Sequence, residues 1–490
     1  MRVNIENIKN KIASLPLPLK TSLIYICCSI LQKGIAFIAV PIYTRLISPE
    51  QYGVYSLYQS WDSILCIFAT LNMWNYLFNN GMLKYEEDRD RFTSALIGLS
   101  GLLTGILFIV YLCFNQSFTA ISGLSFGIMI LMFIEFLLRP SYEYWCSRQR
   151  FEYDVRRYAI AAISITLLTP IVSVALILFS NKNYPEQSGA ALVLGKVACA
   201  GIIYIMVLIS LLKRNRKLYD KEIWKYALNY NVPLIPHFLS GVILSQSDRI
   251  MIGNICGKAE AGIYSVAYSV AAVLLIVNAA VMDSIIPWTY KCLKKQDYSK
   301  LPMVSGCALL LIAGLNILVA ICAPEIISIM APEEYQIAKY IIPPVAISNV
   351  FIFMFNLYAN IEYFYEETKL VAIASCFSAI ANIILNYIFI KKFGFIAAGY
   401  TTVACYILYA LCHYIFMRHV LRKNGISSNV YNNFVLWAIG ILATIIAILM
   451  IVIYPYFIVR IAIVVLALIF VLIYHKKIIG FFIQIKKDKE

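Results

Sequence analysis

Ionisable side chains stand inside several long apolar stretches of this 490-residue chain. The clearest case is SQSDRIMIG (245–253), where Asp248 and Arg249 follow three polar residues inside an apolar run over 232–255. Other apolar runs contain Lys33, Asp62, Glu135 and Lys196. A charge at the centre of a bilayer costs roughly 2.5–3.5 kcal/mol on insertion scales. Such side chains are therefore expected to line a water-filled space or to pair with one another.

Two interpretations of residues 245–249 stay open. At 100° per residue, five consecutive polar residues cover the whole circumference of a helix, which then cannot face lipid. They would line a cavity or pack within protein. Alternatively, Arg249 extends toward the outer end of its helix while Asp248 pairs with it.

Similar alternatives stay open for the other charged residues in the apolar runs. Lys33 and Lys196 are expected either in a cavity or in buried ion pairs. Asp62 is expected to pair with a base between helices or to bind a coupling ion. Glu135 is expected near the membrane interface in a structural role, and the other interfacial candidates are His413, His419 and His475.

The elements that must position these residues are membrane-spanning helices. The chain is 61% hydrophobic and 14% charged, whereas soluble domains are about 25% charged. Runs of about 20 apolar residues can cross a bilayer core of roughly 30 Å. The sequence therefore predicts an all-α polytopic membrane protein with about fourteen spans, near 21–44, 54–77, 93–114, 118–139, 158–180, 189–212, 232–255, 262–288, 303–323, 337–361, 370–390, 394–417, 433–453 and 457–475.

The distribution of basic residues predicts the orientation of these spans. If both termini are cytoplasmic, 30 of the 41 Lys and Arg residues fall in cytoplasmic segments, as the positive-inside rule requires. One predicted cytoplasmic loop, 362–369, is net acidic. The net charge of +15 is then mainly a topology signal, so no nucleic-acid partner is needed to explain it.

The predicted loops leave no room for a soluble catalytic domain. The longest, 213–231, has 19 residues. The 13 cysteines are scattered without a metal-binding spacing, and no phosphate-binding loop of the Gly-x₄-Gly-Lys-Ser/Thr type is present. We therefore expect neither an enzyme nor a bound metal or cofactor.

A short internal repeat divides the chain. YGVYSLYQS (52–60) and AGIYSVAYS (261–269) share one glycine, one tyrosine and two serine positions, and they open spans of the same predicted orientation. Halves repeated without inversion are related by an axis along the membrane normal, as in transporters that bind substrate between two bundles. The basic segment 213–231 would link these halves.

Three segments, PIYTRLISPEQYGVYSLY (41–58), SDRIMIGNICGKAEAGIYSVAY (247–268) and NIILNYIFIKKFGFIAAGYTTVACY (382–406), carry a family resemblance. In that order they resemble signature regions of the polysaccharide transporter family, most closely the O-antigen type flippases of the multidrug/oligosaccharidyl-lipid/polysaccharide exporter superfamily. The resemblance implies two six-helix bundles plus two C-terminal helices. The domains would be 1–212, a cytoplasmic basic linker 213–231, 232–417, and 418–490 with the cytoplasmic tail.

The resemblance implies a flippase that moves an undecaprenyl-diphosphate-linked oligosaccharide, of O-antigen, lipopolysaccharide or capsule type, across the bacterial inner membrane by alternating access. Its diphosphate would need cations, and the candidates are Lys33, Lys196, Arg249 and Arg45. The candidates for ion coupling or pairing are Asp62, Glu135 and Asp248. Expected partners are membrane lipid, a polysaccharide polymerase and chain-length machinery.

Two other functions stay as alternatives. A multidrug/cation antiporter of the same superfamily would want a dominant acidic site, whereas the deep bases here slightly outnumber the acids. A membrane polymerase or ligase of polysaccharide repeats would want a large external loop with Arg and His clusters. The lipid-linked peptidoglycan precursor is disfavoured as substrate because its flippases typically carry several arginines in the first helices.

Overall fold

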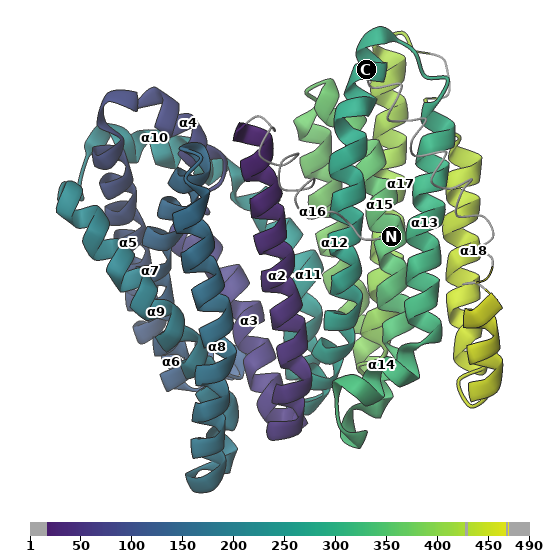
Figure 1. The fold of residues 1–490 in the computed structure, drawn as a ribbon, viewed down its shortest axis with the longest axis horizontal. Coiled ribbons are helices and arrows are strands. Elements are labelled where there is room, and N and C mark those ends of the chain that lie inside the picture. The colour runs from purple at the N-terminus through teal and green to yellow at the C-terminus, as the bar shows by residue number, and fades with distance from the viewer. Residues whose placement is uncertain (1–16, 427–429, 467–468, 470–490) are drawn as a thin grey trace, which may run out of the picture. The chain divides into compact units, whose positions relative to one another are not determined.

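The computed structural model describes residues 17–426, 430–466 and 469. In this part of the chain the secondary structure consists of helices without strands. The chain divides into two compact units, residues 1–262 and 263–490. The helices of each can be followed by colour in Figure 1.

The first unit is a helical bundle in which α3 and α9 contact several other helices. Its helices are α2 (Leu17–Leu46), α3 (Pro49–Thr70), α4 (Tyr76–Lys84), α5 (Arg89–Cys113), α6 (Asn115–Ser122), α7 (Phe126–Phe151), α8 (Val155–Asn183), α9 (Ser188–Arg214), α10 (Lys221–Asn231) and α11 (Ile235–Ile255). Short 3₁₀ turns are η1 (Glu86–Asp88), η2 (Pro185–Gln187) and η3 (Val232–Leu234). Helix α3 packs against α5, α7, α9 and α11, and α9 packs against α7 and α8. These contacts bring together helices that are far apart in the sequence.

The second unit has α15 at its centre. Its helices are α12 (Lys258–Lys295), whose first turn belongs to the first unit, α13 (Leu301–Ile321), α14 (Ala323–Met330), η4 (Glu333–Tyr340), α15 (Ile342–Phe364), α16 (Thr368–Phe393), α17 (Ala397–Lys423) and α18 (Asn433–Val452). Helix α15 packs against α13, α17 and α18. Most of its side chains are buried, as expected for an apolar helix surrounded by others.

Of the first thirteen predicted spans, all but the fourth fall mainly on one helix. Ten helices are long and apolar enough to cross a membrane among the described residues, or eleven if a bent pair counts as one span. Helices α3 and α11 are absent from that count, and both contain clusters of polar residues. In the last predicted span, 457–475, a helix is described over Phe457–Leu466, and most of the remainder lies outside the described residues. The all-α membrane fold is confirmed, whereas the count of fourteen stays a prediction.

The predicted span 118–139 has the wrong boundaries. Helices α6 and α7 meet there at a bend of 96°. Gly123 ends α6 in the left-handed conformation, with φ of 67°, which favours glycine because it lacks a Cβ. The apolar helix starts at Phe126 and continues to Phe151, twelve residues beyond the predicted end.

The repeated segments 52–60 and 261–269 lie near the N-terminal ends of α3 and α12. Their glycines meet within the first unit: a Cβ on Gly262 would lie 2.8 Å from the Gly53 nitrogen, and one on Gly53 would lie 1.8 Å from the Lys258 carbonyl oxygen. The repeat thus marks a crossing that only glycine permits. The compact units also divide after Gly262, beyond the predicted linker 213–231, because α11 packs on α3.

Candidate functional site

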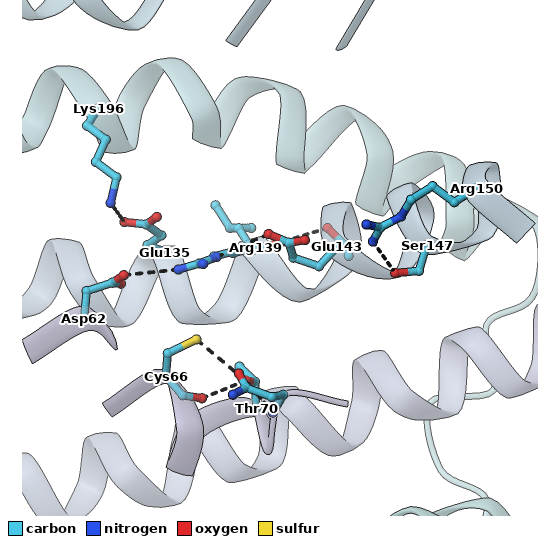
Figure 2. A network of polar contacts seen from close by, with 12 residues as sticks. Asp62, Cys66, Thr70, Glu135, Arg139, Glu143, Ser147, Arg150 and Lys196 are labelled. Carbon is cyan, nitrogen blue, oxygen red and sulfur yellow. Dashed lines mark hydrogen bonds and ion pairs between the residues drawn. The ribbon is translucent and has the colours of Figure 1, made fainter. Parts of the chain in front are cut away.

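A network of charged residues crosses the interior of the first unit between α3, α7 and α9 (Figure 2). Glu135, Arg139 and Glu143 lie four residues apart on α7 and so share one face of that helix. Arg139 donates from Nη1 to Asp62 Oδ2 of α3 at 3.1 Å, and its Nε lies 3.6 Å from Glu143 Oε1. From α9, Lys196 Nζ donates to Glu135 Oε2 at 3.2 Å. Each cation is therefore held by a carboxylate.

The pairs between α3 and α7 follow a regular pattern. The Tyr58 hydroxyl donates to Glu135 Oε2 at 2.5 Å, one turn before the Asp62–Arg139 pair. Both pairs join residues 77 positions apart in the sequence. A constant difference means that the two helices run in the same direction. Lys196 also lies over the Tyr58 ring, 5.0 Å from its centre, in cation–π range.

The two cations of the network remain accessible while two of their partners, Glu135 and Asp62, are buried. The Lys196 and Arg139 side chains are 25% and 26% exposed, whereas Glu135 is 3% exposed. Asp62 Oδ1 and the neighbouring Trp61 Nε1 are buried without a hydrogen-bond partner in the described part of the chain. A buried unpaired polar atom is costly, so this corner of the network can accept a further ligand or water.

Arg249 and Asp248 lie on α11, against another side of α3. Both are buried. Arg249 Nη1 donates to the Ser245 carbonyl and to Gln246 Oε1, each at 2.7 Å, and Gln246 Oε1 also accepts from Ser60 Oγ of α3 at 3.3 Å. The Arg249 side chain therefore turns toward the N-terminal end of α11, opposite to the direction that snorkelling would require.

The remaining predicted cations lie on α2. The Lys33 and Arg45 side chains are exposed on the surface of the first unit. Arg45 donates from Nη1 to the Pro41 carbonyl at 2.8 Å. The structure thus brings Lys196, Glu135 and Asp62 together, and leaves Lys33 and Arg45 outside this network.

Three members of the network are absent from the sequence-based candidates: Tyr58, Arg139 and Glu143. Arg139 is the last residue of the predicted span 118–139, whereas in the structure α7 continues past it to Phe151. The i, i+4, i+8 spacing of two acids around one base is the signal that could have found them. Glu135, expected in a structural role near the interface, is buried and lies at the centre of the network, and its depth in the membrane stays a prediction.

The network is suited to binding a charged ligand through an exchange of hydrogen-bond partners. A charge-assisted hydrogen bond between an ammonium or guanidinium and a carboxylate can be replaced by one to a phosphate oxygen. No group of three or more His, Cys, Asp or Glu side chains in the described ranges is arranged to hold a metal ion.

A second charge cluster lies outside the spans, at the start of α10. The Asp220 side chain caps α10 by accepting the Ile223 N–H at 3.3 Å, and it accepts from Arg91 Nε at 2.8 Å. Burial raises the pKa of Asp220, but hydrogen bonds from Arg91, the Ile223 N–H and Lys217 outweigh it and lower the pKa to about 2. This carboxylate therefore stays charged at any physiological pH.

Two relatives of known origin are similar to this chain over most of its length. Lsg locus putative protein 1 of Haemophilus influenzae is 22% identical over 371 residues, covering 74% of this chain and 88% of that protein. The probable low-salt glycan biosynthesis flippase Agl15 of Haloferax volcanii is 21% identical over 401 residues, covering 80% of this chain and 82% of that protein.

Solved structures share the fold. The inward closed conformation of the lipid II flippase MurJ aligns with a TM-score of 0.60 at 15% identity, covering 87% of this chain and 97% of that chain. An inward-facing multidrug resistance transporter of the MATE family aligns with a TM-score of 0.59 at 14% identity, covering 81% and 96%. Identities this low establish the architecture alone.

Two family profiles match the sequence itself. Residues 233–388 match the profile named MatE. Residues 19–292, more than half of the chain, match the profile described as Polysaccharide biosynthesis protein. The resemblance inferred from the three signature segments is therefore confirmed: the chain belongs to the polysaccharide biosynthesis protein family.

Proposed function

We propose that this protein is a flippase that moves undecaprenyl-diphosphate-linked oligosaccharide repeats, of O-antigen or capsule type, across the bacterial inner membrane by alternating access, with both termini in the cytoplasm. The observation that carries the proposal is the pair of part-exposed cations, Lys196 and Arg139, held by carboxylates inside an apolar bundle. The match to the polysaccharide biosynthesis family and the glycan flippase among its relatives support it.

The diphosphate would bind by exchange. Lys196 is exposed enough for its ammonium to turn from Glu135 to a phosphate oxygen, and Glu135 would keep the hydrogen bond from Tyr58. The exchange replaces one charge-assisted bond of Lys196 by another, while Glu135 keeps only a hydrogen bond from a neutral hydroxyl, and this cost offsets part of the gain. Weak net binding of this kind suits a transporter, which must release what it carries.

The other predicted residues have supporting parts in this proposal. Lys33, Arg45 and Arg249 would supply further positive charge along the path of the headgroup. Asp62, Glu135 and Asp248 would hold the cations between transport cycles or bind a coupling ion. The polyprenyl tail would stay in lipid, and a polymerase and chain-length machinery would receive the translocated repeat.

A second function, export of organic cations in exchange for H⁺ or Na⁺, is favoured by the MatE profile match over 233–388. The carboxylates Asp62 and Glu135 would then bind the drug in place of Arg139 and Lys196. No comparable observation favours a polymerase or ligase.

The test uses the full chain in proteoliposomes with a synthetic undecaprenyl-diphosphate-linked oligosaccharide that carries a fluorescent label on the sugar. Lys196→Met removes one charge-assisted bond, worth about 1.5–3 kcal/mol, and is expected to slow translocation roughly ten- to hundred-fold. The matched control is Lys182→Met, at the exposed C-terminal end of α8, which should translocate at the wild-type rate.

Three outcomes separate the functions. Slow translocation by Lys196→Met and a normal rate for the control support the flippase. Equal rates for all three proteins at matched amounts would remove Lys196 from the mechanism. Absence of lipid translocation by the wild type, with efflux of an organic cation such as ethidium from the same vesicles, would establish the antiporter instead.

A further inference from the structure

An acid and a histidine are paired in the interior of the second unit. Glu362, in the last turn of α15, and His413 of α17 are both fully buried. His413 Nδ1 and Glu362 Oε1 are 2.8 Å apart, a hydrogen-bond distance. The sequence alone predicts a loop position for Glu362, which is wrong because Glu362 lies within α15. The interfacial position predicted for His413 stays a prediction.

Among the residues that the structure describes, no charge other than His413 acts on Glu362. His413 packs on the rings of Phe355 and Tyr409, with centres 5.7 and 4.8 Å from its own. The titratable groups that interact with Glu362 or with Tyr409 are neutral at physiological pH: Tyr409 and Cys412 of α17, Tyr363 of α15 and Cys376 of α16.

The helices packed around α15 and α17 agree with this picture. Helices α13 and α18 contain no Asp, Glu, Lys or Arg. From α16, Ser375 bonds to the Tyr409 hydroxyl at 2.7 Å. From α12, Tyr290 packs on Phe364, two residues beyond Glu362. Arg418, the nearest cation along α17, is exposed and bonds to the Tyr414 hydroxyl.

Each partner has one atom left over. Glu362 Oε2 and His413 Nε2 are buried and have no hydrogen-bond partner among the residues that the structure describes. These are the two atoms that can gain or lose a proton while the Nδ1–Oε1 bond persists. With Nδ1–H donating to a carboxylate, an added proton goes to Nε2. If Nδ1 instead accepts a hydrogen bond from a carboxylic acid, the added proton is on the carboxyl group.

Charge decides how many protons the pair holds. A carboxylate beside a neutral imidazole leaves a net charge of −1 in an apolar interior, and a carboxylic acid beside an imidazolium leaves +1. Burying an uncompensated charge is costly. The intermediate state has one proton more than the first and one fewer than the second, and it is neutral overall. It is either a carboxylate paired with an imidazolium or a carboxylic acid beside a neutral imidazole.

We propose that Glu362 and His413 form a binding site for a single exchangeable proton in the second unit. Release returns the proton to water and leaves a carboxylate hydrogen-bonded to a neutral imidazole, with no other bond made or broken. Because the pair is fully buried, exchange requires the α15–α17 contact to open. Proton binding is independent of the proposed function, whereas its use to drive translocation rests on that function.

The first test measures proton binding through stability, with the full chain in nanodiscs. The unfolded chain releases the histidine proton above pH about 6.5, while the native pair retains it. Stability is then fully present below that pH and is lost as pH rises until the native pair releases the proton. Over this window the unfolding equilibrium constant of the wild type should rise by up to tenfold per pH unit relative to Glu362→Gln, which has no charge to compensate.

The control for this test is Glu367→Gln, a part-exposed acid five residues further on that pairs with Lys423. It should keep the wild-type slope between pH 6.5 and 9. Superimposable slopes for the wild type and Glu362→Gln would overturn the proposal.

A second measurement needs no variant and covers the case in which Glu362→Gln does not fold. Deuterium exchange at the histidine C2–H, read peptide by peptide in the mass spectrometer, gives the pH midpoint of each ring. The exposed His419 serves as an internal reference. A His413 midpoint displaced from that of His419 supports a shared proton, and coincident midpoints would contradict it.

The link to transport is tested in the proteoliposomes described above. The readout is the ratio of translocation rates with and without an imposed proton gradient of two pH units. We expect a ratio of at least threefold for the wild type and of about one for Glu362→Gln. Equal ratios in both proteins would show that the pair does not couple protons to transport, and the proposed flippase function would stand. Absence of wild-type translocation would reject the flippase function. The stability test would then still decide whether the pair binds a proton.

Discussion

The interiors of the two units use polar residues in opposite ways. Within the first, three carboxylates and two cations form a network on α3, α7 and α9 whose cations stay about one quarter exposed. Within the second, amides connect the helices instead: Asn349 Nδ2 donates to Asn316 Oδ1 and to the Ala271 carbonyl, and Asn278 donates to the Asn349 carbonyl. Its buried charge is confined to the Glu362–His413 pair and to an edge pair of Arg460 with Glu325 among the described residues.

Glycines show the same contrast. In the first unit, a Cβ on Gly53, Gly98, Gly189 or Gly262 would lie within 2.4 Å of a backbone oxygen of another segment. In the second unit, Gly399 and Gly440 come no closer than 3.0 Å, to side-chain atoms. Elements of the first unit therefore meet backbone to backbone, whereas those of the second meet through side chains that can adjust.

The difference separates two ways of building a membrane bundle. Charges need partners and access to water, so a unit that contains them must hold its helices in fixed positions. Amide hydrogen bonds between membrane helices average only about 0.6 kcal/mol, and they tolerate the loss of a partner. The first unit is thus expected to be the more sensitive to substitution.

The largest effect is expected from Arg139→Met. The change leaves Asp62 and Glu143 without their cation, and breaking a buried ion pair in this way costs about 3 kcal/mol or more of unfolding free energy. Asn349→Leu, its counterpart in the second unit, should cost about 1 kcal/mol. Reversible unfolding of the full chain in micelles measures both.

A double variant sharpens this comparison. Asp62→Asn combined with Arg139→Met removes one of the two orphaned charges and should recover part of the loss. If Asn349→Leu cost as much as Arg139→Met, the contrast between the two interiors would be wrong.

A smaller effect is expected from the glycines. A Cβ on Gly189 would lie 2.4 Å from the Gln51 carbonyl oxygen, so Gly189→Ala should lower the unfolding free energy by about 2 kcal/mol through overpacking. Gly314→Ala on α13 meets no atom within 4 Å and should be neutral or slightly stabilising. The measurement is the thermal unfolding midpoint of each variant in the same detergent. A lower midpoint in both variants would contradict the conclusion that backbone contacts make Gly189 the more sensitive position.

The smallest effect concerns acid stability outside the spans. The pKa of Asp220 is lowered to about 2 in the native protein from about 3.9 in an unfolded chain. Its stabilisation is therefore present above pH about 4 and is lost as pH falls toward 2. Asp220→Asn should flatten the dependence of the unfolding midpoint on pH between 5 and 3.

The counterpart in the second unit is Glu367, whose pKa is lowered by its hydrogen bond to Lys423. Its side chain is 27% exposed, compared with 4% for Asp220. Glu367→Gln should therefore change the acid dependence less than Asp220→Asn, and the reverse order would refute this ranking.

Much of the helical architecture follows from the sequence because about 20 apolar residues suffice to define a span. Uncharged helices such as α13 and α18 fall where they are predicted. The break at Gly123 is not predicted because a single left-handed residue leaves no trace in the hydropathy of its neighbours. That omission placed the end of a span at Arg139 and hid the continuation of α7 to Phe151.

The sequence identifies individual residues of the site but does not predict how they are paired. Lys196, Glu135 and Asp62 each stand out as charges in apolar runs, but the pairs join α3, α7 and α9 through residues that are 61 to 77 positions apart in the sequence. Pairing depends on which helices pack together and in which rotation, and this is decided by tertiary contacts. Glu362 was missed for a local reason, because α15 runs three residues past the predicted end of its span.

The constant spacing of the contacts between α3 and α7 constrains how the first unit can move. If α3 slid along α7 by one helical turn, Asp62 would face Glu135 and two carboxylates would meet in an apolar interior. The opposite slip would set Tyr58 against Arg139 and bring Asp62 to Glu143, which is again a pair of carboxylates. Shear between these helices is therefore blocked in either direction by charge alone. Any rearrangement during a working cycle must carry α3 and α7 together as one rigid body.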